Sequence, residues 1–214
     1  MGVHVDVPSG AIRIAPGDVV DQPFTVHNTG CGTDRFTFEV TGSSSTWTTV
    51  EPPVMELRAG SGAAARLRFH PPRVAHVRAG EVPFGVLAVS AGTATCRMVE
   101  GLLLVASFDD TRVELDPPVQ EGRRASYRLQ VHNGGNTLLH LTVRADCDDA
   151  DVSLRCRPGT LSLHPGEVRS CRVDVRVPRA AANRSPNGHV FRVIAQPVGR
   201  DPIVVGGLLL PPRR

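Results

Sequence analysis

The sequence lacks the apolar segments that mark membrane and secreted proteins. No apolar run approaches the roughly 18 residues that a membrane span needs. The apolar stretch at 102–106 has the length of a buried strand. The N-terminal residues contain neither a basic stretch nor an apolar core of the kind found in secretory signals. We therefore expect a cytoplasmic protein that does not insert into a membrane.

Aromatic residues are scarce, at 4% of the chain. Sugar-binding sandwiches usually display several planar aromatic side chains, so this scarcity weighs against a carbohydrate-binding or cell-wall-binding module, which we keep as the alternative interpretation. The single tryptophan, Trp47, is expected to plug or border a core and not to serve as an exposed platform for a sugar.

Motifs of catalysis are also missing. The chain has no nucleophile elbow, no zinc-protease helix motif and no phosphate-binding loop. Its eight histidines are not spaced as metal ligands. His27 and His132 occupy equivalent places before a turn, where we expect them to point outward from a sheet. The sequence thus predicts a protein that is not an enzyme, with no cofactor, no metal site and no catalytic residue.

The five cysteines are an odd number and fit neither a zinc pattern nor a redox motif. Cys96 and Cys171 lie in alternating apolar patterns, where we expect free thiols that behave as small buried apolar groups. This usage favours a reducing compartment. A bridge between Cys147 and Cys156 is the one pairing that the sequence leaves open.

Positive charge is carried by arginine alone, and it is divided unevenly. Residues 1–106 contain 8 arginines against 9 acidic residues, whereas residues 107–214 contain 16 against 12. The formal net charge of +3 is too small to indicate a nucleic-acid partner.

An internal repeat organises the chain. Residues 24–30 match 129–135, and 101–104 match 207–210, with further matching blocks between them in the same order at an offset of 105 to 107. One unit of about 105 residues is therefore written twice. We predict two domains, at 1–106 and 107–214, joined by a short linker at 106–110.

Within each unit the apolar residues alternate with polar ones, as in Phe24 and Val26 or Leu129 and Val131. This period of two is typical of strands with one buried face. Frequent glycine and proline exclude long helices. The expected strands are 11–15, 19–27, 34–41, 46–50, 54–58, 63–70, 81–90, 95–105, 111–116, 124–132, 138–145, 152–156, 160–163, 168–177, 189–196 and 203–210. The predicted fold class is all-β, with two tandem immunoglobulin-like antiparallel β-sandwiches.

Turn and core residues of both units carry a family resemblance. Gly17, residues 24–30, residues 34–36, Trp47 and Pro52 with the prolines and glycines that follow them resemble the NEW3-like and major-sperm-protein-like branch of bacterial immunoglobulin-like domains. The resemblance is closer in the first unit. It implies accessory, adhesive or structural modules of larger bacterial assemblies, including phage-tail-like particles, and it carries no catalytic residues.

Two surface features are candidate sites. Arg128 is expected on the outward face of one strand, and Arg172 and Arg176 on that of another, which together would form a basic patch for a protein partner. A solvated face balanced by Asp174 and Glu114 is the other interpretation. The second feature is an acidic loop, whose carboxylates could hold Ca²⁺ or remain solvated. Its members are Asp146, Asp148, Asp149 and Asp151.

These observations favour a non-catalytic protein-interaction or structural module, an accessory or scaffold subunit of a larger bacterial assembly such as a phage-tail-like contractile particle. Its partner would be bound by strand addition at a sheet edge or by docking on the arginine patch. The sequence does not indicate the oligomeric state.

Overall fold

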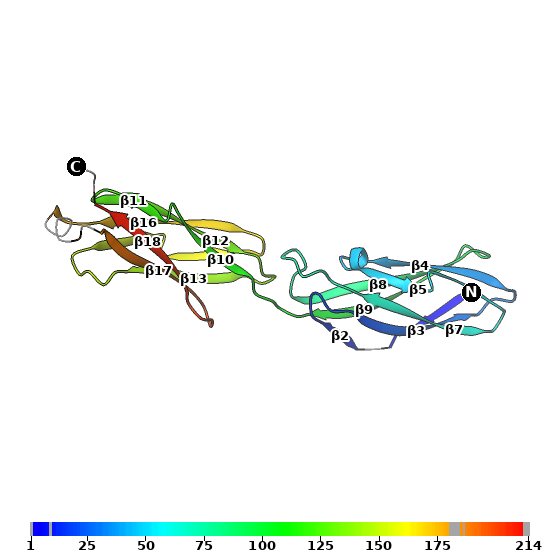
Figure 1. Ribbon diagram of the computed structural model, residues 1–214. Helices are drawn as coiled ribbons and strands as arrows, with labels where there is room; N and C mark the ends of the chain where they lie inside the picture. Colours follow the sequence, from blue (N-terminus) through cyan, green and yellow to red (C-terminus); the bar gives the residue numbers. More distant parts are fainter. Residues whose placement is uncertain (1, 9, 180–184, 186, 212–214) are drawn as a thin grey trace. The chain divides into compact units, whose positions relative to one another are not determined.

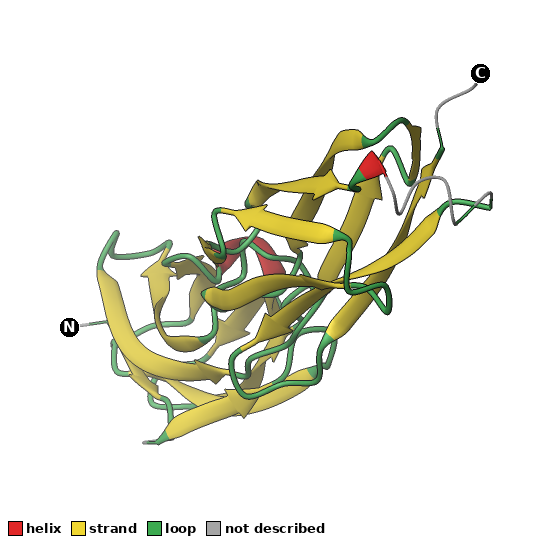
Figure 2. Ribbon diagram, turned by 90° about the vertical axis from the view of Figure 1, so that its left-hand side faces the viewer, coloured by secondary structure: helices red, strands yellow, loops and turns green. Residues whose placement is uncertain are grey.

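The computed structural model describes residues 2–8, 10–179, 185 and 187–211. The chain divides into two compact units, Met1–Phe108 and Asp109–Arg214, called the first and second domains below (Figure 1). The sequence placed the boundary two residues earlier, at 106. Figure 2 shows that strands make up nearly all of the regular structure in both domains.

The first domain is a sandwich of two sheets. The four-stranded sheet has the order β1-β3-β7-β5, and the five-stranded sheet has the order β2-β9-β8-β4-β6. The strands are β1 (Val3–Asp6), β2 (Ala11–Ile14), β3 (Val20–Asn28), β4 (Asp34–Thr41), β5 (Thr48–Glu51), β6 (Val54–Leu57), β7 (Gly62–Phe69), β8 (Gly80–Ser90) and β9 (Cys96–Val105). A 3-10 turn, η1 (Ser45–Trp47), precedes β5.

The second domain repeats this order strand for strand. Its sheets are β10-β12-β16-β14 and β11-β18-β17-β13-β15. The strands are β10 (Thr111–Asp116), β11 (Val119–Glu121), β12 (Arg124–Asn133), β13 (Leu139–Asp146), β14 (Ser153–Arg157), β15 (Thr160–Leu163), β16 (Val168–Arg176), β17 (His189–Pro197) and β18 (Ile203–Leu210).

Both domains have the immunoglobulin-like arrangement. The first strand of each is divided between the sheets, and its second half pairs in parallel with the last strand, as β2 does with β9 and β11 with β18. The other strand neighbours are antiparallel. A second division follows the cis peptide bonds Glu51–Pro52 and Arg157–Pro158, where the chain passes from one sheet to the other. The predicted tandem of immunoglobulin-like sandwiches is confirmed.

The strands expected from the alternating pattern are present, and two more were missed. β1 and β11 are the first-strand segments that the sequence analysis did not assign, and they have only four and three residues. The strand expected at 46–50 begins at Thr48, because η1 precedes it and the Thr48 hydroxyl donates to the Ser44 carbonyl at 2.7 Å. Among the described residues, no helix is long and apolar enough to span a membrane.

Cross-strand pairs of phenylalanine and glycine explain one of the repeated motifs. Phe84 lies opposite Gly101 on β9, and Phe191 lies opposite Gly207 on β18. A Cβ atom at Gly101 would lie 2.3 Å from Cζ of Phe84, and one at Gly207 would lie 2.2 Å from Cζ of Phe191. The phenyl rings therefore occupy the space over the glycines, and both rings are buried in the cores.

A buried asparagine is the last residue of β3 in the first domain and of β12 in the second, and its side chain forms hydrogen bonds to neighbouring segments. The side-chain nitrogen of Asn133 donates to the carbonyls of Thr137 (2.8 Å) and Leu163 (3.1 Å), and its side-chain oxygen accepts from the Gly135 amide (3.2 Å). The backbone of Asn133 bonds to Glu167 and Gly166, where β16 is about to begin. Every hydrogen-bonding group of this side chain is thus used.

Asn28 is the equivalent residue of the first domain. Its side-chain nitrogen donates to Gly32 (2.8 Å) and Leu57 (2.9 Å), and its oxygen accepts from the amide of Gly30 (2.9 Å). Its backbone bonds to Gly60 and Ser61 just before β7. The repeated asparagine therefore ties three segments together in each domain.

We expect Gly207→Ala to destabilise the second domain by about 1–3 kcal/mol, because the added methyl group must displace the Phe191 ring in a packed core. Urea unfolding followed by far-ultraviolet circular dichroism measures this change. Gly206→Ala is the matched control, since a Cβ at Gly206 meets no heavy atom within 4 Å. Equal effects of the two substitutions would contradict the packing explanation.

Replacing either asparagine by alanine should cost about 2–4 kcal/mol, because buried carbonyl and amide groups lose their partners. Trp47 is the only tryptophan and borders the first core. Asn28→Ala should therefore shift the unfolding midpoint that Trp47 emission reports. Asn133→Ala should leave that midpoint in place and lower the stability reported by the near-ultraviolet signal of Tyr127, the only tyrosine. Unchanged midpoints in both variants would show that the hydrogen bonds of the two asparagines do not stabilise their domains.

Candidate functional site

The candidate site is the outward face of the four-stranded sheet in the second domain. On β12 the side chains of Tyr127 and Leu129 are buried, so that Arg128 between them is exposed. Arg128 pairs with Arg172 on β16, and Arg172 pairs with Arg157 on β14. Three arginines from three neighbouring strands therefore stand in one row, called the first arginine row.

A second arginine row lies four residues further along the same strands. There Arg124 on β12 pairs with Arg176 on β16. Between the two rows, Asp174 lies opposite Ser126 on one side and Arg155 on the other. We call the whole surface the arginine face. Its arginines are Arg124, Arg128, Arg155, Arg157, Arg172 and Arg176, all of them exposed.

The structure places all three arginines predicted from the sequence on this face, and it adds three that were missed. Arg124 lies on β12, and Arg155 and Arg157 lie on β14. The alternation along 153–157 was present in the sequence, but the position of β14 beside β16 was needed to bring its arginines to Arg172.

Most arginines of the arginine face are not in an ion pair with any described residue, although Asp116 on β10 lies opposite Arg128. Arg172 Nε lies 2.8 Å from Asp174 Oδ1. Within the described part of the chain, the other five arginines of the face have no ion-pair partner. Partial burial raises the pKa of Asp174, but hydrogen bonds from Arg172 and Ser126 and the charge of Arg157 outweigh it, so the pKa lies below its usual range. Asp174 therefore stays ionised between the rows.

Two hollows open between these side chains. The larger, of about 610 Å³, is lined by Arg128, Arg157 and Arg172, by Ser126 and Ser170, and by Asp116, which lies opposite Arg128 on β10. The smaller, of about 380 Å³, is lined by Arg124, Arg176 and Asp174 among others. Guanidinium groups present several N–H donors in a plane and bind carboxylate or phosphate in a bidentate manner. The arginine face is therefore chemically suited to an anionic partner.

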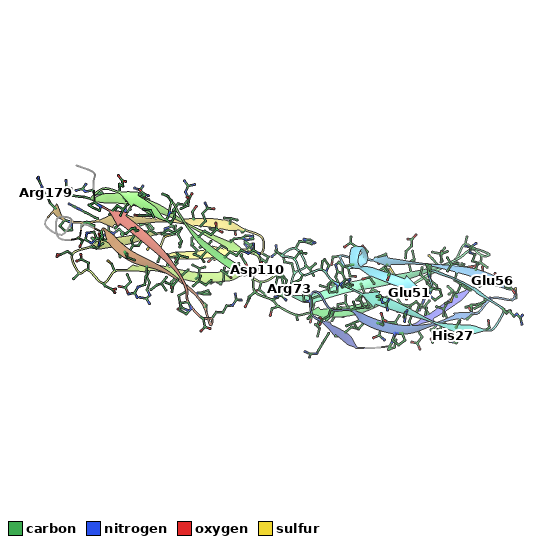
Figure 3. The ribbon with its side chains drawn as sticks, in the orientation of Figure 1. His27, Glu51, Glu56, Arg73, Asp110 and Arg179 are labelled. Carbon is green, nitrogen blue, oxygen red and sulfur yellow. The ribbon has the colours of Figure 1, made fainter. Side chains whose placement is uncertain are left out.

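The equivalent face of the first domain is neutralised within itself. There Arg66 takes the place of Arg172. Its neighbours are Pro23, in the place of Arg128, and Glu51, in the place of Arg157. Arg66 Nε donates to Glu51 Oε2 at 2.9 Å, and Glu51 is labelled in Figure 3. Arg68 Nε lies 2.9 Å from Asp21 Oδ1, and this hydrogen bond holds the pKa of Asp21 below its usual range.

The acidic loop is bound to basic side chains of its own domain. Arg192 Nη2 lies 3.3 Å from Asp146 Oδ2 and 3.0 Å from Asp148 Oδ1. Asp149 Oδ2 lies 3.1 Å from His189 Nδ1. No group of three or more potential metal-ligating side chains occurs among the described residues. Asp146, Asp148 and Asp149 are thus in contact with basic side chains of the second domain.

The cysteines are all free thiols. Cys171 is fully buried as expected, but Cys96 is exposed, which corrects the prediction. Cys96 begins β9 shortly after a turn, and the first three residues of this strand are all exposed. Cys147 and Cys156, whose bridging the sequence left open, are separate: Cys147 Sγ donates to the Val190 carbonyl at 3.2 Å, whereas Cys156 lies beside Cys171, whose hydrogen bond raises the Cys156 pKa.

The remaining candidates have structural positions. His27, labelled in Figure 3, is exposed and His132 is half-buried, so both face away from the core as expected. Trp47 is half-buried and packs edge-on against Phe69, with 6.5 Å between ring centroids. This confirms that Trp47 borders the core. Every phenylalanine, tyrosine and tryptophan of the chain is buried or half-buried.

No protein-family model matches this sequence, and comparison with curated proteins finds no match. Solved structures with similar folds include the IG1 and IG2 domains of DIP-gamma, with 13% identity, a TM-score of 0.45 and coverage of 98% of each chain. The D00–D0 domains of Intimin have 10% identity and a TM-score of 0.40, covering 97% of this chain and 99% of theirs. The E. coli chaperone DraB has 12% identity and a TM-score of 0.37, covering 95% and 97%. At these scores the fold assignment rests on the strand order described above.

The Asp21–Arg68 pair predicts how the first domain responds to acid. The pKa of Asp21 is lowered in the folded state, so its ionised form stabilises the fold above the unfolded pKa of about 3.9. That contribution is lost as the pH falls through the lower, folded pKa. Urea midpoints from Trp47 emission should therefore fall less between about pH 4 and pH 2 in Asp21→Asn than in the wild type.

Asp18→Asn is the control for this experiment, because Asp18 is exposed and has no ion-pair partner among the described residues. The same acid response in the wild type and in Asp21→Asn would show that the ion pair does not contribute.

Proposed function

We propose that this chain is a non-catalytic protein-interaction module whose second domain docks on an acidic surface of a partner through the arginine face. The observation that carries this proposal is the set of five exposed arginines that have no ion-pair partner among the described residues. Exposed charges of one sign steer association with an oppositely charged surface and determine which partners are rejected.

The first domain supports this interpretation by contrast. The same strands of the same fold carry a self-neutralised face around Arg66 and Arg68. An uncompensated face is therefore not needed to build the sandwich. Its presence in the second domain supports the proposal that this domain contacts the partner.

The wider setting belongs to the same proposal. The motifs shared with NEW3-like and major-sperm-protein-like domains support an accessory or scaffold subunit of a larger bacterial assembly in the cytoplasm, with a phage-tail-like contractile particle as the specific version. The carbohydrate-binding alternative loses its main candidate, because Trp47 packs against Phe69 and no aromatic side chain is exposed. We therefore rank a protein partner first.

The test is a pull-down of the tagged full chain from the cytoplasm of its own organism, with sizing of the purified protein alongside. We expect a discrete partner that is retained by the wild type and lost from Arg128→Glu/Arg172→Glu/Arg176→Glu, with affinity lower by about tenfold or more and falling with salt. The reason is that three guanidinium groups are replaced by carboxylates that repel an acidic surface.

Arg13→Glu/Arg58→Glu/Arg78→Glu is the matched control, since it makes the same change of charge at three exposed arginines of the first domain. It should retain the partner. The proposal fails if the wild type enriches nothing, or if the second-domain variant retains the same partner as the wild type.

A further inference from the structure

The charges on the arginine face have a definite order along the strands. The first arginine row and the second arginine row are four residues apart on both β12 and β16. At about 3.3 Å per residue, the rows are about 13 Å apart. The row between them contains Ser126 on β12, the ionised Asp174 on β16 and Arg155 on β14. On β12 and β16, the side-chain charge is therefore positive in the first arginine row, negative in the middle row and positive in the second arginine row.

Each arginine row borders a hollow, and both hollows also have a carboxylate in their lining. The 610 Å³ hollow is lined by arginines of the first arginine row and also by Asp116, and the 380 Å³ hollow is lined by Arg124 and Arg176 of the second row and also by Arg172 and Asp174. Because neighbouring strands are about 4.8 Å apart, the guanidinium groups within a row can reach one carboxylate together. The arginine face therefore offers guanidinium groups to a carboxylate at each row, with the carboxylate of Asp174 on β16 between the two rows.

From this order we propose that the partner presents an extended segment with acidic residues at positions i and i+4 and a non-acidic residue at i+2, laid along β12 and β16. In an extended chain, side chains two residues apart point the same way, so i, i+2 and i+4 all face the sheet. Their spacing of about 13 Å from i to i+4 equals that of the two rows. The inference rests on the proposed function and specifies the shape of the partner.

A helical segment fits this spacing less well. Side chains on one side of an α-helix recur after seven and after eleven residues, at about 10.5 Å and 16.5 Å, and a residue about 13 Å away lies on the opposite side. An extended segment places both carboxylates without such a mismatch. Asp174 adds selectivity, because a carboxylate at i+2 would face it.

The experiment uses synthetic peptides and the whole protein. One peptide contains Glu-Ser-Thr-Ser-Glu, a second of the same composition has its two glutamates two residues apart, and a third contains Glu-Ser-Glu-Ser-Glu. Each is titrated at about 0.01 M ionic strength, where screening is weak. Chemical shifts of the backbone amides and of the arginine Nε–H groups report both the affinity and the place of binding.

We expect the first peptide to bind about threefold to fivefold more tightly than the second, and to shift signals of both arginine rows. The third peptide should gain nothing from its extra charge. Arg124→Ser/Arg176→Ser and Arg128→Ser/Arg172→Ser should each abolish the preference for the four-residue spacing. Asp174→Ser should let the third peptide bind about threefold to fivefold more tightly than the first.

The inference is overturned if affinity follows peptide charge alone, if the spacing has no effect, or if none of the peptides shifts signals of the arginine face. These results leave the proposed function separately testable. A partner that is still lost from Arg128→Glu/Arg172→Glu/Arg176→Glu would then bind through a folded acidic surface. A partner retained by that variant would remove both proposals.

Discussion

The hydrogen bonds of Asn133 fix the register on which the arginine face depends. Its backbone amide and carbonyl bond to Glu167 and Gly166 immediately before β16, and its side chain holds the ends of the neighbouring segments. From this point β12 and β16 run antiparallel, which brings Arg128 opposite Arg172. A slip of one residue would turn every outward arginine into the core. A buried amide thus determines the position of exposed charges several residues away.

The first domain has the same asparagine hydrogen bonds beneath a surface of different charge. Asn28 fixes β3 against β7, which brings Arg66 opposite Pro23, and β5 on the other side of β7 places Glu51 opposite Arg66. The buried positions of the two domains are alike, whereas the outward positions differ in charge. Since outward side chains of a sheet do not determine the core, the repeat can keep one fold and carry two surfaces.

The alternation of apolar residues and the repeat predicted most strands and the class of fold, because burial of one sheet face leaves a period of two in the sequence. The short segments β1 and β11 were missed because three or four residues give too little alternation to recognise. Cys96 was misjudged because alternation says which residues share a face but not whether another layer covers it. Arg155 and Arg157 were not predicted as part of the site, because alternation does not say which strands are neighbours. The fold places β14 beside β16 and so brings these arginines to Arg172.

The first arginine row places like charges beside one another, and among the described residues only Arg172 of its three arginines is in an ion pair, with Asp174. Like charges directly opposite each other on neighbouring strands destabilise a sheet. Arg172 has Arg128 on one side and Arg157 on the other. The first domain shows that the fold accepts an acidic residue at the position of Arg157, because Glu51 occupies the equivalent position and binds Arg66. A carboxylate supplied by a partner would restore in the complex the neutral arrangement that the first domain builds from its own residues.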